Sequence, residues 1–117
     1  MNHDDIELYI QITSAAVKLA KTKYHVPVII LEPGAGPAEL DDYLAGTGFT
    51  IAAINQRLRD GGATVIDASL DKEQAAGMVL SIPGDGHPTA LANRLRASIL
   101  RNYLEHNMPE VLASSLN

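Results

Sequence analysis

Cysteine and tryptophan are absent from this sequence of 117 residues, and phenylalanine occurs once. Without cysteine the chain can form no disulfide, no thiolate metal site and no thiol nucleophile. Basic residues are also few, because 9 Lys and Arg stand against 14 Asp and Glu and give a formal net charge of -5. This balance provides no electrostatic attraction to a phosphate backbone, so we expect no nucleic-acid partner.

Long apolar runs and a basic leader are missing as well. No stretch of the sequence approaches the roughly 18 apolar residues that a membrane-spanning helix needs. The opening residues Met-Asn-His-Asp-Asp carry acids where a secretion signal carries basic residues. We therefore expect a cytoplasmic chain with no membrane span. There is also no internal repeat and no long linker rich in Pro, Gly or Ser, which predicts a single α/β domain over residues 1–117.

The hydrophobic pattern predicts helices that alternate with short strands. Residues 4–23 place apolar side chains at steps of three and four, which is typical of an amphipathic helix. Residues 26–31 and 63–67 are continuous apolar runs rich in β-branched side chains, typical of parallel strands covered on both faces. Further helical segments are predicted at 38–44, 49–60, 70–76 and 89–106, followed by a short turn at 109–110; the pattern at 78–82 is ambiguous.

This order of elements indicates an α/β fold in which helices flank a small parallel sheet. Parallel strands that follow one another along the chain need a crossover connection, and that connection is right-handed in nearly all proteins. A sheet of so few strands leaves open edges with unpaired backbone groups. We therefore expect either a homo-oligomer or a missing N-terminal half to cover these edges.

Four polar residues are candidates for a functional site. In open α/β sheets, ligands gather at the carboxyl ends of the strands, where Glu32 follows the first predicted strand and Asp67 ends the second. Asp85 and His87 lie in the loop of residues 83–88, whose glycines permit a turn tight enough for the carboxylate to reach the imidazole. An Asp that orients a His is half of a general-base apparatus. The alternative is that Asp85 caps the turn and His87 is an ordinary exposed loop residue.

Other patterns point less clearly to chemistry. Gly34-Ala35-Gly36 lacks the third glycine of a dinucleotide-binding motif and the Gly-Lys-Ser/Thr of a P-loop. The four candidate residues could together bind a metal, but no His-x-x-x-His pair or Asp-rich loop supports this, so we expect neither a metal nor a cofactor. Five serines are candidate nucleophiles, but structural roles fit each of them better: Ser69, which is the best placed because it follows a strand, Ser81, Ser98, Ser114 and Ser115.

Residues 82–97 resemble the final block of the SGNH (GDSL-type) esterases and lipases. That block holds the triad Asp and His in a short loop, places Pro and a small polar residue after the His, and ends the domain with a helix. The residues that match these places are Asp85, His87, Pro88 and Thr89. The resemblance extends more loosely over residues 8–106 and implies the C-terminal half of a flavodoxin-like SGNH hydrolase fold.

The sequence also departs from that family. The family's nucleophilic Ser stands in a Gly-Asp-Ser block, and a Gly and an Asn from two later blocks build its oxyanion hole; none of these blocks occurs here. One residue separates Asp85 from His87, where the family usually has two. The resemblance implies a chain that supplies the Asp and His of a Ser-His-Asp triad for hydrolysis of a small ester or acylated sugar, and that is inactive alone. The alternative is a non-catalytic, stand-alone α/β module that self-associates or binds a protein partner.

Overall fold

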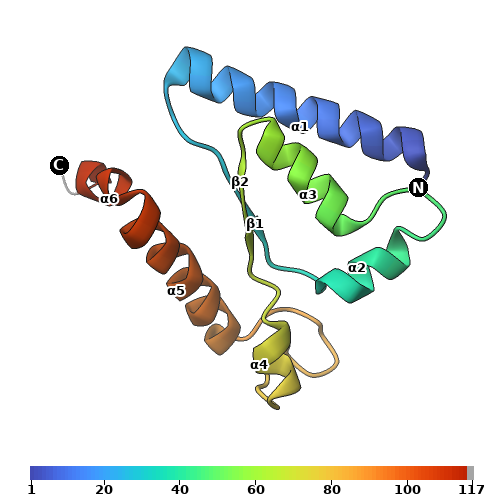
Figure 1. The fold of residues 1–117 in the computed structure, drawn as a ribbon. Coiled ribbons are helices and arrows are strands. Elements are labelled where there is room, and N and C mark those ends of the chain that lie inside the picture. Colours follow the sequence, from blue (N-terminus) through green and yellow to red (C-terminus); the bar gives the residue numbers. More distant parts are fainter. Residues whose placement is uncertain (116–117) are drawn as a thin grey trace. The chain divides into compact units, whose positions relative to one another are not determined.

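Residues 1–115 are described in the computed structural model, and they form helices and strands in α/β order (Figure 1). The chain divides into two compact units, Met1–Asp67 and Ala68–Asn117. The first unit contains α1 (His3–Tyr24), β1 (Ile29–Glu32), α2 (Pro37–Tyr43), α3 (Ile51–Asp60) and β2 (Thr64–Asp67). The second unit contains α4 (Asp71–Ala75), α5 (Ala90–Asn107) and α6 (Pro109–Ser115). The predicted alternation of helices with two short strands is confirmed, while the single domain over residues 1–117 stays a prediction.

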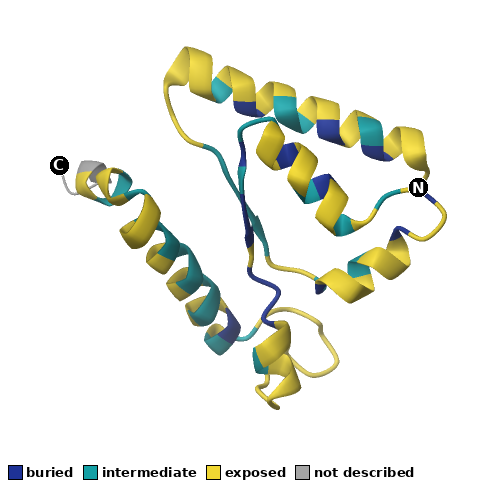
Figure 2. Ribbon diagram, in the orientation of Figure 1, coloured by how far each residue is buried: buried dark blue, intermediate teal, exposed yellow. Residues whose placement is uncertain are grey.

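Helix α1 is fixed at both ends by its own sequence. The Asn2 side chain accepts a hydrogen bond from the Asp5 backbone at 3.0 Å, and the Asp5 carboxylate accepts one from the Asn2 backbone at 2.9 Å. This reciprocal capping box satisfies two backbone donors that have no partner within the helix. The helix ends at Tyr24, because His25 adopts a left-handed conformation with φ 55°. Figure 2 shows that the buried positions of α1 lie on the side facing α3, and these are Ile6, Ile10 and Val17.

The sheet consists of two parallel strands of four residues each. Its register pairs Ile29 with Thr64 and Glu32 with Asp67, so the two carboxyl ends lie side by side. The predicted strand 26–31 began too early, because the Val26 backbone N–H donates to α1 and Pro27 has no N–H to donate. The expectation of strands covered on both faces is also wrong for β1, whose four residues are all only half-buried.

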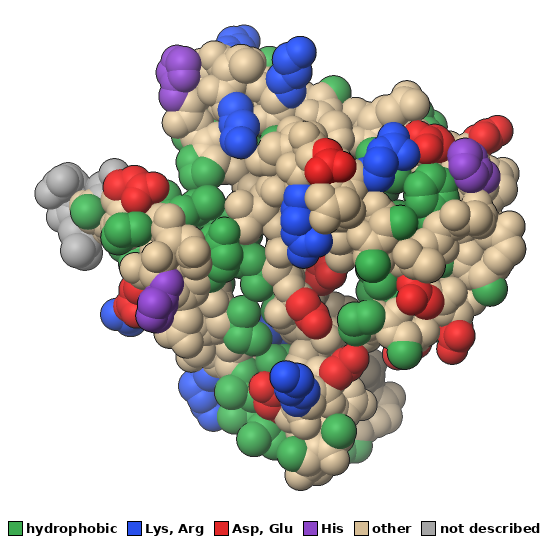
Figure 3. Space-filling model, viewed as in Figure 1, with side chains coloured by type: hydrophobic (Ala, Val, Ile, Leu, Met, Phe, Trp, Pro, Cys, Tyr) green, Lys and Arg blue, Asp and Glu red, His purple; other side chains and the backbone are tan. Residues whose placement is uncertain are grey.

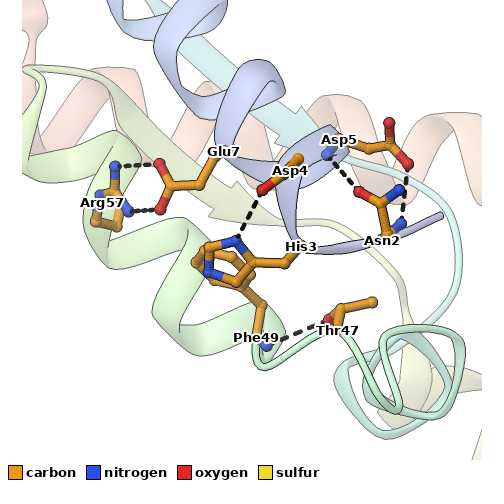
Figure 4. A network of polar contacts seen from close by, with 8 residues as sticks. All are labelled: Asn2, His3, Asp4, Asp5, Glu7, Thr47, Phe49 and Arg57. Atoms are coloured by element: carbon orange, nitrogen blue, oxygen red, sulfur yellow. Dashed lines mark hydrogen bonds and ion pairs between the residues drawn. The ribbon is translucent and has the colours of Figure 1, made fainter.

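The core of the first unit lies where α1, α3 and the sheet meet. Buried side chains from these elements pack together, and they include Ile10, Val17, Ile54, Leu58 and Val65. An ion pair joins the two helices at the surface, with the two terminal nitrogens of the Arg57 guanidinium, Nη1 and Nη2, donating to the Glu7 carboxylate at 2.8 and 3.0 Å (Figure 4). The His3 ring lies 5.0 Å from the Phe49 ring and holds the segment before α3 against the start of α1.

The second unit has a smaller core beneath the N-terminal part of α5. It consists of buried Leu70, Leu80 and Ala92, with Leu91, Leu95 and Ile99 packed against them. The ambiguous segment 78–82 forms neither a helix nor a full strand. A single antiparallel bridge joins Ser81 to Pro88, which closes residues 82–87 into a loop.

Candidate functional site

The Asp85–His87 loop is built by backbone geometry that only glycine adopts easily. Gly84 and Gly86 have φ values of 76° and 83°, in the left-handed region. The Asp85 backbone N–H donates to the Ile82 carbonyl at 3.1 Å, and the Ile82 N–H donates to the His87 carbonyl at 2.8 Å. A side-chain Cβ added at either glycine would touch nothing within 4 Å, so conformation rather than crowding requires glycine there.

The loop brings the two predicted site residues into contact. The Asp85 Oδ1 atom lies 2.6 Å from Nδ1 of His87, as the tight turn predicted. With its proton on Nδ1, the ring donates to the carboxylate and leaves Nε2 as the basic nitrogen. The His87 side chain is 76% exposed and the Asp85 side chain 52%. Solvent screens a contact this exposed, so it orients the imidazole more than it stabilises the fold.

Thr89 anchors the loop to α5. Its hydroxyl accepts a hydrogen bond from the Ala92 backbone at 3.2 Å, which caps the helix, and donates to the Val79 carbonyl at 3.0 Å. Its own backbone N–H donates to the Leu80 carbonyl at 3.0 Å. The Thr89 side chain therefore joins the start of α5 to Val79, on the other side of the loop, and this sets the position of the loop that carries His87.

The five serines named above as candidate nucleophiles occupy varied positions. Ser81 takes part in the bridge that closes the loop, Ser69 is 7% exposed, and Ser98 is exposed on α5. The side chains of Ser114 and Ser115, at the end of α6, lie outside the described part of the structure. None of these placements identifies a nucleophile.

Glu32 and Asp67 lie together at the carboxyl ends of the strands, which confirms their predicted placement. Burial raises the pKa of the Glu32 carboxyl; the nearby charge of Asp67 adds to this effect, whereas a hydrogen bond from Asn55 and the charge of Arg59 oppose it. Asp85 belongs to the other unit. Within residues 1–115, no group of three or more His, Asp or Glu side chains is arranged to hold a metal ion.

A groove next to Glu32 was not predicted from the sequence. It has a volume of about 700 Å³ and is lined by residues of α1, α2 and α3 together with Glu32 and Asn55. The sequence did contain a signal, because Asn55 stands on the stripe formed by Ile51, Ile54 and Leu58, where an apolar side chain is expected. A polar residue at such a position has to find a partner or face a cavity.

Comparisons with protein-family models, with curated proteins and with solved structures found no match for this chain. No helix among residues 1–115 is long and apolar enough to cross a membrane. On the face drawn in Figure 3, basic and acidic side chains are interspersed and do not gather into one continuous basic surface.

Proposed function

We propose that this chain supplies the Asp and His of a Ser-His-Asp triad in an ester hydrolase of the SGNH type, acting on a small ester or acylated sugar. The observation that supports the proposal is the 2.6 Å contact between Asp85 and Nδ1 of His87. The contact occurs in a short loop that leads directly into a capped helix, α5, which is the arrangement of the final block in that family. We also propose that the α/β arrangement of this chain corresponds to the C-terminal half of an SGNH domain.

In this mechanism His87 handles one proton in each half of the reaction. Nε2 takes the proton from a serine hydroxyl as the serine oxygen attacks the ester carbonyl, and then gives it to the departing alcohol. A water molecule hydrolyses the resulting acyl-serine by the same exchange in reverse. Throughout the reaction, Asp85 accepts a hydrogen bond from the Nδ1–H group of His87 and stabilises the imidazolium. The serine and the oxyanion donors come from outside these 117 residues.

The test is fluorophosphonate labelling followed by intact mass, because this reagent reacts with a serine activated by a neighbouring base. The protein is expressed from its own locus, including any reading frame upstream of the Met1 codon, as wild type, His87→Ala and His106→Ala. His106 is a matched control, because its Nδ1 forms a hydrogen bond with the Asn102 carbonyl on α5 and not with a carboxylate. We expect one adduct, on a serine of an upstream Gly-Asp-Ser block, that disappears only in His87→Ala.

Two results would contradict the proposal. One is an upstream sequence that encodes no Gly-Asp-Ser block, and the other is labelling that persists in His87→Ala. A His87-dependent adduct on the 117-residue chain alone would contradict the external nucleophile and assign that role to one of the chain's own serines.

A second candidate function is that of a non-catalytic module that self-associates. The half-burial of every residue in β1 supports it, because a parallel strand is ordinarily covered. Sedimentation equilibrium on the folded chain tests this candidate: a concentration-dependent dimer supports it, and a monomer at all concentrations contradicts it.

A further inference from the structure

The groove in the first unit is apolar over most of its length. Its walls come from α1, α2 and α3, and the side chains that form them are Ile6, Tyr9, Tyr43, Leu44, Ile51 and Ile54. Two of these, Tyr9 and Tyr43, are 49% and 71% exposed, so their rings are available to a molecule entering from solvent. Its volume of about 700 Å³ lies within the range of small-molecule sites.

The polar end of the groove contains an acceptor without a donor. The amide Nδ2 of Asn55 donates to the Glu32 carboxylate at 3.3 Å. The other amide atom, Oδ1, is buried and has no hydrogen-bond partner among the described residues. Because Oδ1 is closed to solvent, a ligand with an N–H or O–H group would reach it only after the Asn55 amide rotates toward the groove, and would then recover the free energy that an unpaired buried acceptor costs.

The charged side chains that line the groove are both acidic. These are Asp5 and Glu32, and no Lys, Arg or His side chain among residues 1–115 lines it. Asp5 is already engaged in the cap of α1, which leaves Glu32 as the carboxylate that faces the groove with no cationic partner in direct contact among the described residues. The charge of Asp67 acts on Glu32 more strongly than the charge of Arg59 does. A cation is therefore the complementary head group.

We propose that this groove binds a primary alkylammonium ion, with the ammonium between Glu32 and Asn55 and the alkyl chain along the apolar walls. The ammonium donates one hydrogen bond to the Glu32 carboxylate and, once the Asn55 amide has rotated toward the groove, one to its Oδ1. An alcohol of the same length would satisfy Asn55 but leave the Glu32 charge without a counter-ion, and a carboxylate would be repelled. The proposal is independent of the Asp85–His87 pair, which belongs to the other unit.

The test is an NMR titration of the full chain with n-octylammonium chloride, following the tyrosine ring signals. Tyr9 and Tyr43 line the groove, whereas Tyr24 and Tyr103 do not and serve as internal controls. We expect saturable shifts at the first pair alone. Octanol should bind more weakly than octylammonium, and octanoate should cause no saturable shift.

Variants identify the contacts. Glu32→Gln should weaken octylammonium binding by about 10-fold or more, because a charge-assisted hydrogen bond is lost. Asp42→Asn removes the same charge from an exposed position on α2 that does not line the groove, and should change affinity less than about 2-fold. The Tyr43 ring is too exposed to contribute much to the stability of the fold, so Tyr43→Ala should weaken binding several-fold through the lost contact with the alkyl chain.

Three results would each overturn the proposal. They are an unchanged affinity in Glu32→Gln, octanoate binding as tight as octylammonium binding, and no saturable shift in the wild type.

Discussion

Replacing Thr89 with alanine should destabilise the second unit through the loop that carries His87. The substitution removes the cap on α5, the 3.2 Å bond from the Ala92 backbone, and the 3.0 Å bond to the Val79 carbonyl. Loss of a Thr cap costs about 1 kcal/mol. The Val79 carbonyl is on a residue that is 62% exposed, so water replaces that bond and adds only about 0.5 kcal/mol. We expect a total loss of about 1.5 kcal/mol in the free energy of unfolding.

Thr89→Ser is the matched control, because it keeps the hydroxyl and with it both hydrogen bonds. Urea unfolding followed by far-UV circular dichroism measures the difference. With a slope of about 1.5 kcal/mol per molar urea, the Thr89→Ala midpoint should fall by about 1 M and the Thr89→Ser midpoint should change little. Equal midpoints for the two variants would show that the hydroxyl does not anchor the loop and would refute this account.

Three further predictions concern stability. Gly86→Ala should cost about 1 kcal/mol, since φ is 83° there, whereas Gly34→Ala, with open space and no positive φ, should be close to neutral in the same urea assay. Leu58→Ala, at a side chain 2% exposed, should cost about 3 kcal/mol in urea unfolding, and a loss below about 1 kcal/mol would argue against a packed core in the first unit. The Arg57 hydrogen bond lowers the pKa of Glu7 below its ordinary 4.5, so the pair's stabilisation is present above pH 4.5 and is lost as pH falls through the lowered value. Wild type should therefore lose its stability advantage over Glu7→Gln on acid titration, and a constant difference from pH 7 to pH 2 would contradict this.

The Asp85–His87 contact could be predicted because it is local. Two glycines in left-handed conformations turn the chain within a few residues, and the interacting side chains are separated by one position. From the sequence, Thr89 is matched only to the small polar residue that follows the Pro in the SGNH block. Its role as the cap of α5 is equally local, because its hydroxyl accepts a hydrogen bond from the backbone of a residue three positions further along the chain. Interactions of this range depend on backbone preferences that the sequence encodes directly.

The Glu32–Asn55 pair could not be predicted because its members lie 23 positions apart in the sequence. The sequence placed Glu32 at the end of a strand, but the position of α3 relative to that strand depends on how α1, α3 and the sheet pack together. The same packing leaves the groove open beside the pair. Such a site depends on several long-range contacts at once, and no short pattern contains them.

By itself the sequence determined the order of helices and strands, the parallel pairing and the turn that joins Asp85 to His87, because periodicity, capping residues and glycine conformations act over a few residues. The late start of β1 is local as well, because the backbone N–H of Val26 closes α1 by donating to Ala20, six residues back. Tertiary structure alone decided the half-burial of β1 and the groove at Glu32, because burial and cavities are properties of how elements pack and not of any one segment.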